Sequence, residues 1–345
     1  MSPKKVLVGM SGGVDSSVTA ALLIEQGYDV SGVFVEAYNE PGCRTDQDKK
    51  DALQVALKLK IPFEVLDLRK QYKEKVVKYF FDEYRAGRTP NPDVVCNREV
   101  KFGILYDWAR ERGYDYLATG HYARIAIDDR GQHWLQQPRD KAKDQTYFLW
   151  QVARDKLEHI LWPLGELEKS EVRSIAHKLD LPNANKPDSM GVCMIGEVNV
   201  HDFLQDKLGS KSGEVYWHEK RVGTHDGVWF YTIGARGGWK VDPDAQSEAM
   251  PPLYVIGKDV VNNRLRVGQR EEAHLSQFSV ESYGGEFEKN NLFVRIRNLG
   301  ELIKVLDITN NVVRIERPVF APAAGQSAVF YDEVGRVRGG GVIAN

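Results

Sequence analysis

The chain has 345 residues, of which 42% are hydrophobic and 28% charged, the composition of a soluble globular protein with room for two or three domains. Residues 1–5 lack the apolar core of a signal peptide and no run of about 18 apolar residues occurs, so we expect no membrane partner. The net charge of -2 leaves nucleic-acid binding open, because that needs only Lys and Arg clustered on one face. Three widely spaced cysteines, Cys43, Cys96 and Cys193, argue against a disulfide scaffold and favour a cytoplasmic location.

Up to about Leu181, short apolar segments alternate with amphipathic ones. Strands are predicted at 5–9, 30–35, 63–68 and 116–119, and helices at 16–26, 46–60, 72–86 and 101–112. This β-α-β-α order predicts a doubly wound parallel sheet, whose ligands bind beyond the carboxyl ends of the strands. Residues 11–17 and 119–122 both follow predicted strands, so we expect them to border one crevice.

Beyond about Leu204 the helical periodicity fades, and Gly, Asp and Asn separate short apolar segments. Strands are predicted at 228–233, 253–257 and 264–267, and then at 292–297, 302–308, 312–316, 327–331 and 337–343. The spacing of the last five is typical of a small antiparallel barrel or sandwich. The predicted domains are an α/β catalytic domain at 1–205, a small central β-rich domain at 206–271 and a C-terminal β-barrel at 272–345.

The most informative segment leaves the first strand as Ser11-Gly12-Gly13-Val14-Asp15-Ser16-Ser17 and opens a helix. It lacks the Gly-Lys-Ser/Thr ending of the usual nucleotide triphosphatase loop. Backbone N–H groups, glycines and hydroxyls at the positive end of a helix form a seat for pyrophosphate, although a Gly-Gly pair alone is more often an ordinary tight turn. The pattern resembles the pyrophosphate loop of ATP pyrophosphatases, which split ATP into AMP and pyrophosphate.

A second segment is Asn91-Pro92-Asp93-Val94-Val95-Cys96-Asn97. Pro90 and Pro92 predict an extended, rigid loop, because the residue before each proline avoids the α region. Asp93 and Cys96 would then face one substrate, and a cysteine near a helix N-terminus tends to have a lowered pKa. A lone cysteine here is equally well read as a small buried apolar residue.

A third segment, Asp188-Ser189-Met190-Gly191-Val192-Cys193-Met194-Ile195-Gly196, places a cysteine between two glycines. Glycines on each side suit a backbone that can bring a sulfur towards a partner. Taken alone, the segment also fits a buried strand cysteine.

These segments occur in order with several others, and together they resemble the tRNA-specific 2-thiouridylases over nearly the whole chain. The further matching motifs are Gly87-Arg88-Thr89-Pro90, Ala118-Thr119-Gly120-His121-Tyr122-Ala123-Arg124, Lys143-Asp144-Gln145-Thr146-Tyr147-Phe148-Leu149, Tyr231-Thr232-Ile233-Gly234 and Gly325-Gln326-Ser327-Ala328-Val329-Phe330-Tyr331. Members of this family place sulfur on C2 of the wobble uridine of tRNA.

The resemblance implies ATP-dependent activation of the uridine C2 oxygen, followed by its replacement with sulfur, which yields 2-thiouridine, AMP and pyrophosphate. Cys193 would carry the sulfur as a persulfide. Cys96 would act as the nucleophile that frees sulfide or closes a transient Cys96–Cys193 disulfide. Asp93 would be a general acid or base towards the base ring.

The resemblance also implies the binding residues, with ATP and Mg²⁺ as cofactors and no metal held by protein side chains alone. The expected ATP contacts are Gly9, Met10, Ser11, Gly12, Gly13, Val14, Asp15, Ser16, Val35 and Gly120. The expected contacts to the target base, which must leave the anticodon stack, are Asn91, Pro92 and Asp93. The expected tRNA contacts are His121, Lys143, Asp144, Gln145, Arg297, Asn298 and Gln326; His121 is equally well read as a core histidine behind the phosphate site.

The implied partners are tRNA, by resemblance the lysine, glutamate and glutamine species, and a sulfur donor. The donor would be a cysteine desulfurase or a relay of carriers. The chain departs from the usual family pattern at four positions, Val35, Met194, Ala235 and Asn298, which weakens the contacts assigned to Val35 and Asn298. Cys43 has no assigned role; joining Cys96 and Cys193 around an iron–sulfur cluster is an alternative that no Cys-x-x-Cys pair favours.

Three other functions compete. A pyrophosphate-loop ligase acting on a small substrate, such as an argininosuccinate or guanylate synthetase, would share Ser11–Ser17 but would not need Cys96 and Cys193. A cytidine thiolase would be expected to show Cys-x-x-Cys cluster ligands, which are absent from the sequence. A tRNA-binding protein that has lost catalysis would not need Asp15 and both cysteines intact.

Overall fold

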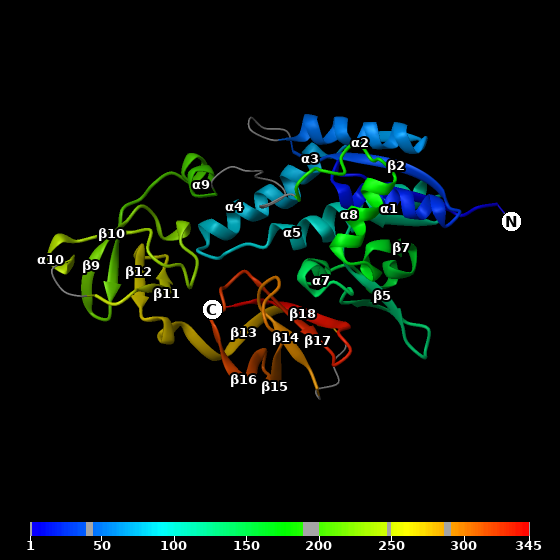
Figure 1. Cartoon of the computed structure of the whole chain (residues 1–345). Helices are drawn as coiled ribbons and strands as arrows, with labels where there is room; N and C mark the ends of the chain where they lie inside the picture. Colours follow the sequence, from blue (N-terminus) through cyan, green and yellow to red (C-terminus); the bar gives the residue numbers. More distant parts are fainter. Residues whose placement is uncertain (1, 39–43, 189–199, 247–249, 286–290, 345) are drawn as a thin grey trace. The chain divides into compact units, whose positions relative to one another are not determined.

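The computed structural model describes residues 2–38, 44–188, 200–246, 250–285 and 291–344 (Figure 1). The chain divides into two compact units. The first unit comprises residues 1–77, 92–197 and 332–338, and the second comprises residues 78–91, 198–331 and 339–345. Within the described ranges, no helix combines the length and the apolar character needed to cross a bilayer.

The first unit is built on a five-stranded sheet in the order β3-β2-β1-β4-β7, with every neighbouring pair parallel. The strands are β1 (Lys5–Gly9), β2 (Asp29–Glu36), β3 (Phe63–Asp67), β4 (Tyr116–Thr119) and β7 (Ile160–Leu161). A two-stranded hairpin adds β5 (Arg124–Ile127) and β6 (His133–Gln136). The predicted doubly wound parallel sheet is confirmed, and β1 and β4 have the predicted bounds.

Helices flank this sheet in chain order. They are α1 (Val14–Glu25), α2 (Thr45–Leu59), α3 (Arg69–Tyr72), η1 (Lys73–Val77), α5 (Pro92–Val95), η2 (Cys96–Leu105), α6 (Tyr106–Glu111), η3 (Lys141–Lys143), α7 (Thr146–Leu149), η4 (Arg154–His159), η5 (Pro163–Glu166) and α8 (Lys169–Lys178). Val6 and Val8 of β1 pack with Ala20 of α1 and Val55 of α2 in one apolar core. Successive side chains of a strand point to opposite faces, so one stretch of β1 is buried against helices on both faces.

The segment around Cys96 differs from its prediction. The extended backbone ends at Asn91, and a helix begins at Pro92 and continues through a π-helical stretch at Cys96–Leu105 into α6. Proline suits the first position of a helix because its missing N–H would have no partner there. The predicted rigid loop over residues 91–97 is therefore wrong beyond Asn91, and Cys96 lies in the second helical turn.

The second unit contains a five-stranded mixed sheet in the order β10-β9-β8-β12-β11. Its elements are α4 (Lys78–Arg85), α9 (Val200–Leu208), β8 (Gly213–Trp217), β9 (Lys220–His225), η6 (Val228–Phe230), β10 (Lys240–Val241), α10 (Pro243–Gln246), β11 (Tyr254–Asp259) and β12 (Arg264–Gly268). The strand predicted at 228–233 is wrong, because Gly227 has φ +153° and Val228–Phe230 forms a 3₁₀ turn. Val228 instead packs into the apolar core beneath this sheet.

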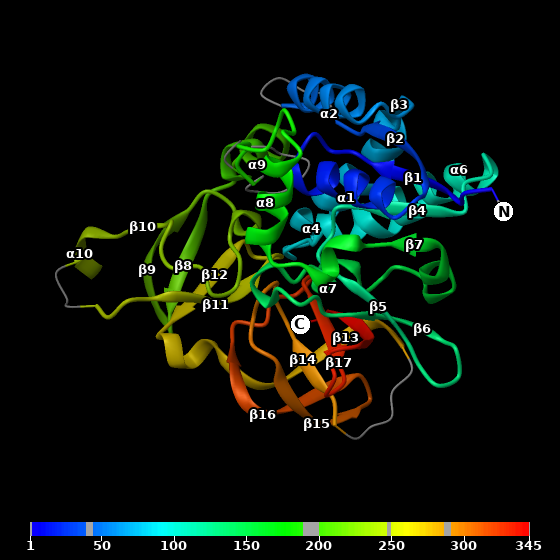
Figure 2. The same cartoon turned by 45° about the vertical axis from the view of Figure 1, so that its right-hand side comes forward.

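The second unit also contains a closed barrel in the order β13-β16-β15-β14-β17-β18 (Figure 2). After η7 (Arg270–Ala273), its strands are β13 (His274–Gly285), β14 (Phe293–Arg295), β15 (Ile303–Thr309), β16 (Val312–Phe320), β17 (Ser327–Tyr331) and β18 (Val337–Ile343). The predicted antiparallel barrel is confirmed. The sequence analysis missed β13, most of whose side chains are partly or fully exposed.

Replacing Phe330 of β17 by alanine should destabilise the barrel by about 3–5 kcal/mol, because this ring is 0% exposed in the barrel core. The measurement is native-state hydrogen exchange of the β14 and β17 amides. Leu306→Ala on β15 is the matched control, since that side chain is 59% exposed and should cost less than about 0.5 kcal/mol. Equal losses for the two variants would contradict the assigned core.

Candidate active site

The loop at Ser11–Ser17 joins the carboxyl end of β1 to the first turn of α1. Its hydroxyls fix the shape of the turn: the backbone N–H of Ser11 donates to Ser16 Oγ at 3.1 Å, and the hydroxyls of Ser16 and Ser17 donate to the Gly13 carbonyl at 3.1 and 2.9 Å. The positive end of α1 therefore begins directly after the glycine pair. Such a terminus binds anionic groups such as phosphates.

Two predicted ATP contacts, Gly12 and Gly120, are positions where the backbone passes too close for a side chain. A Cβ on Gly120, just after β4, would lie 2.6 Å from the backbone nitrogen of Ser16. A Cβ on Gly12, where φ is +77°, would lie 2.2 Å from the backbone oxygen of Asp48. The ends of β1 and β4 thus meet at the first turn of α1, and the predicted shared border of residues 11–17 and 119–122 is confirmed.

Two side chains beyond α8 brace this loop. The amide of Asn183 donates to the Gly12 carbonyl and to Ser17 Oγ, each at 2.9 Å. Lys186 donates to the same carbonyl at 3.2 Å, pairs with Asp48 of α2 at 2.6 Å and forms a close ion pair with Asp51. Burial would raise the pKa of Asp51, but the hydrogen bond from Lys186 outweighs it and lowers that pKa.

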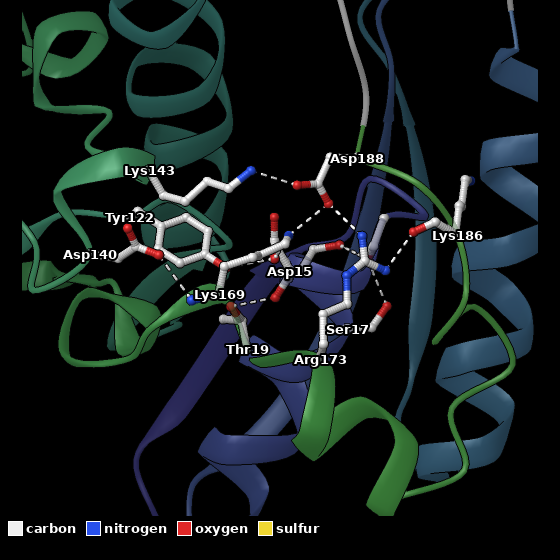
Figure 3. Close-up of polar contacts among 12 residues, drawn as sticks. Asp15, Ser17, Thr19, Tyr122, Asp140, Lys143, Lys169, Arg173, Lys186 and Asp188 are labelled. Atoms are coloured by element: carbon white, nitrogen blue, oxygen red, sulfur yellow. Dashed lines mark hydrogen bonds and ion pairs between the residues drawn. The ribbon is translucent and has the colours of Figure 1, made fainter. Parts of the chain in front are cut away.

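Asp15 in the first turn of α1 is the carboxylate of the loop. Its Oδ1 accepts from Lys169 Nζ of α8 at 2.6 Å and from the Tyr122 hydroxyl at 3.0 Å (Figure 3). Burial, and then the neighbouring Asp15 carboxylate, raises the pKa of Tyr122, so this phenol remains a donor. These contacts hold a cation beside the loop.

Asp188 is surrounded by three cations, as Figure 3 shows. Its carboxylate accepts from Lys143 Nζ at 2.7 Å, from Lys169 Nζ at 2.8 Å and from the Arg173 guanidinium at 2.6 Å. Burial would raise the pKa of Asp188, but the hydrogen bonds from Lys143 and Lys169 outweigh it and lower the pKa to about 2. Asp188 is therefore an anion throughout the physiological pH range.

His121, predicted as a tRNA contact, is buried behind the loop. Its Nδ1 lies 2.7 Å from Thr119 Oγ1, which also accepts from the Trp162 indole at 2.9 Å, and its Nε2 lies 3.4 Å from Lys101 Nζ. A lysine ammonium can only donate, so the neutral ring accepts at Nε2 and carries its proton on Nδ1. Burial, followed by the charge of Lys101, lowers the pKa of His121 well below 6.5.

Cys96 and Asp93 lie one turn apart in the helix that begins at Pro92. Residues three apart share a helix face, so the two side chains project on the same side. The Cys96 side chain is buried, and Asp93 is half-buried. The neighbouring Asn97 donates from its amide to the Phe148 carbonyl of α7 at 3.0 Å, which ties this helix to the segment after Gln145. Cys43 and Cys193 lie outside the described residues.

In the second unit, Gln326 supports the segment that leads to Asn91. Its amide donates to the carbonyls of Thr89 at 3.1 Å and Pro90 at 2.9 Å. The Asn91 backbone N–H contacts the Tyr79 hydroxyl at 3.3 Å, while its side-chain nitrogen is buried without a hydrogen bond among the described residues. Gln326 thus positions backbone rather than presenting its amide outward.

The other predicted contacts fall into two groups. Asp144 is fully buried and accepts from Thr146 and Gln137, while Gln145 accepts the backbone N–H of Tyr122 at 2.9 Å. Arg297, after β14, is exposed and lies over the Phe320 ring with a hydrogen bond to that residue's carbonyl. Among the remaining predicted residues, Gly9 and Met10 end β1, Val35 is half-buried near the end of β2, Pro92 opens α5 and Asn298 follows Arg297.

The sequence analysis missed the side chains around the loop that come from distant segments: Tyr122, Lys169, Arg173, Asn183 and Lys186. Lys169 and Arg173 are spaced as i and i+4 on α8, a pattern common on any solvated helix. Lys186 and Asp188 flank a quoted motif, which was the one available signal. Within the described part of the chain, no group of three or more His, Cys, Asp or Glu residues could hold a metal ion.

Gly12→Ala should weaken binding of ATP or pyrophosphate at least about tenfold, because the added Cβ displaces the loop from α2. Isothermal titration measures this. Gly113→Ala is the matched control: Gly113 has the same φ of +77° with nothing within 4 Å of its Cβ, so it should cost only about 1–2 kcal/mol of stability. Loss of binding in the control, or none in Gly12→Ala, would show that the contact with Asp48 does not matter.

The buried, neutral His121 should make the first unit less stable as the pH falls below 6.5. The unfolded chain then binds a proton that the folded chain excludes, which removes about 1.4 kcal/mol per pH unit. Urea unfolding between pH 6.5 and 5 should give a slope shallower by this amount in His121→Gln. Removing the half-buried His133 instead leaves His121 in place, so that variant should keep the contribution. An unchanged slope in His121→Gln would refute the assignment.

Comparison with known proteins covers the whole chain. Residues 4–197 match a family model described as tRNA methyl transferase HUP domain, residues 201–269 a tRNA methyl transferase PRC-barrel domain, and residues 275–343 an aminomethyltransferase beta-barrel domain. The tRNA-specific 2-thiouridylase MnmA of Enterococcus faecalis is 42% identical, covering 99% of this chain and 96% of its own. The tRNA-specific 2-thiouridylase MnmA 1 of Geobacillus kaustophilus is 44% identical over 96% and 93%. With a pyrophosphate-type loop in its first unit, this chain belongs to the family of tRNA-specific 2-thiouridylases.

Proposed function

We propose that this chain is an ATP-dependent tRNA 2-thiouridylase that replaces the C2 oxygen of the wobble uridine with sulfur. The observation that carries the proposal is the loop between β1 and α1. It presents a helix N-terminus beside three cationic side chains, in a chain that also supplies Cys96 and Cys193. The relatives named above are 2-thiouridylases by name, and their likeness spans nearly the full chain.

The loop supplies the activation step. The C2 oxygen of uracil is a poor leaving group, so exchange for sulfur first requires its adenylation, which releases pyrophosphate from ATP. We propose that Gly9 to Ser16, Val35 and Gly120 bind the nucleotide, with its phosphates at the first turn of α1. Mg²⁺ binds mainly to phosphates and waters, often with one or two carboxylates, so it would enter with ATP and needs no cage of protein ligands.

The two cysteines supply the sulfur. A persulfide on Cys193 attacks C2 of the activated base, a C–S bond forms and AMP leaves. The Cys96 thiolate then attacks the Cys193 sulfur, breaking the S–S bond, so the sulfur stays on C2 and a Cys96–Cys193 disulfide remains. An external thiol reduces that disulfide before the next turnover.

Asp93 and Cys96 share one helix face, which supports a joint role towards one base. We propose that Asp93 exchanges a proton with the ring, while Asn91 and Pro92 contact the flipped base. Lys143, Gln145, Arg297 and Asn298 are proposed tRNA contacts. For the buried or internally bonded His121, Asp144 and Gln326 we propose that they position the backbone behind those contacts.

The proposed partners are tRNAs of the lysine, glutamate and glutamine type and a sulfur donor, either a cysteine desulfurase or a relay carrier. A cytoplasmic location is part of the same proposal, because thiol chemistry needs a reducing compartment.

The decisive assay combines the full chain with unmodified tRNA, ATP–Mg²⁺, a cysteine desulfurase and cysteine. Wild type should form 2-thiouridine with AMP and pyrophosphate. Cys96→Ser and Cys193→Ser should each lower 2-thiouridine formation by at least about a hundredfold, because each removes one of the sulfur atoms of the exchange. Both variants should keep tRNA binding and tRNA-dependent pyrophosphate exchange into ATP, since activation precedes sulfur transfer.

Cys43→Ser is the matched control and should retain activity; its inactivity would favour a three-cysteine iron–sulfur site instead. AMP formation with a small acceptor, indifferent to both cysteine changes, would identify a ligase. Methylated rather than thiolated tRNA, in the presence of S-adenosylmethionine, would overturn the proposed chemistry in favour of the activity named in the family description.

A further inference from the structure

The group around Asp188 has more cations than one carboxylate needs. Lys143 comes from the turn before α7, while Lys169 and Arg173 come from α8, and all three donate to Asp188 at 2.6–2.8 Å. The Arg173 guanidinium is further fixed by the carbonyls of Ala184 and of Lys186 at 3.0 and 2.6 Å. Three long cationic side chains are thereby held converging on one point.

That point adjoins the pyrophosphate-type loop. Lys169 Nζ contacts both Asp188 and Asp15, the carboxylate of the first turn of α1 (Figure 3). The nearby Asp140 does not neutralise the group through a printed ion pair; it accepts the backbone N–H groups of Ala142 and Lys169, each at 3.0 Å. Lys186, by contrast, is already paired with two carboxylates of α2.

We propose that the carboxylate of Asp188 occupies the place of an ATP phosphate group: Lys143, Lys169 and Arg173 bind the phosphates of the nucleotide, and Asp188 gives them up when ATP binds. The inference rests on the proposed use of ATP and names residues of that site. Phosphate oxygens satisfy lysine ammonium and arginine guanidinium groups as carboxylate oxygens do, and a triphosphate brings several charges where Asp188 brings one. The internal carboxylate therefore competes with the nucleotide and reduces its apparent affinity.

The test is isothermal titration of the full chain, without tRNA, with inorganic pyrophosphate and with a non-hydrolysable ATP analogue. Asp188→Asn should bind both about three- to tenfold more tightly, because it removes the competing charge from a partly exposed site. Asp188→Glu keeps the charge and should show no such gain. Lys169→Ala and Arg173→Gln should each bind at least about tenfold more weakly.

Asp180→Asn is the matched control. Asp180 also accepts from a lysine, Lys58 at 2.9 Å, on the exposed end of α2, so its loss should leave both affinities unchanged. If Asp188→Asn does not fold by circular dichroism, Asp188→Ser replaces it, and the Lys169 and Arg173 variants decide independently. Unchanged or weaker binding in the Asp188 variant, or unaffected binding in the cation variants, overturns this inference alone. Failure of wild type to bind either probe overturns the use of ATP as well.

Discussion

The site of the first unit depends on the close approach of backbone to backbone at the first turn of α1. Gly120 brings the end of β4 to within contact of Ser16, and Gly12 brings the loop against Asp48 of α2. At both places a Cβ would overlap main-chain atoms, which cannot move aside as a flexible side chain can. The position of the helix N-terminus is therefore set by the paths of β1, β4 and α2. The parallel sheet supplies this geometry because its strands end together at one edge.

Fixing the loop by backbone contact leaves the charged side chains to different tasks. Lys186 and Asn183 hold the Gly12 carbonyl, and Lys186 is neutralised by α2. Lys143, Lys169 and Arg173 instead share Asp188, whose side chain is about one-third exposed. A half-exposed carboxylate can be replaced by another anion without leaving a buried charge unpaired, whereas breaking the more deeply buried contacts of Lys186 would be costly. The two lysines near the loop thus differ in whether their partner is exchangeable.

The sheet and barrel were predictable because β1, β4, β17 and β18 are short apolar runs bounded by turn residues. The loop was predictable because its glycines and hydroxyls are adjacent in sequence. What escaped prediction depends on tertiary context: Lys169 pairs with Asp15 across the chain, and no local pattern signals such a pair. The helix at Pro92 was misread because proline at a first helical position and proline in a loop look alike. The 3₁₀ turn at Val228–Phe230 was misread because three apolar residues fit a buried strand as well as a turn.

Several motif residues that resemble substrate contacts are used within the fold, and this sharpens the role of Asn91. Gln326 holds the carbonyls of Thr89 and Pro90, so the backbone reaching Asn91 is fixed from outside the helix that follows. The Asn91 side-chain nitrogen is buried with no hydrogen bond among the described residues. A buried donor without an acceptor costs about 1–3 kcal/mol, and folding alone gives no reason to keep it. Uracil offers carbonyl acceptors, so a flipped base would satisfy this donor and recover that cost on binding. The strain in the unbound site then becomes selectivity for a base that presents an acceptor at that position.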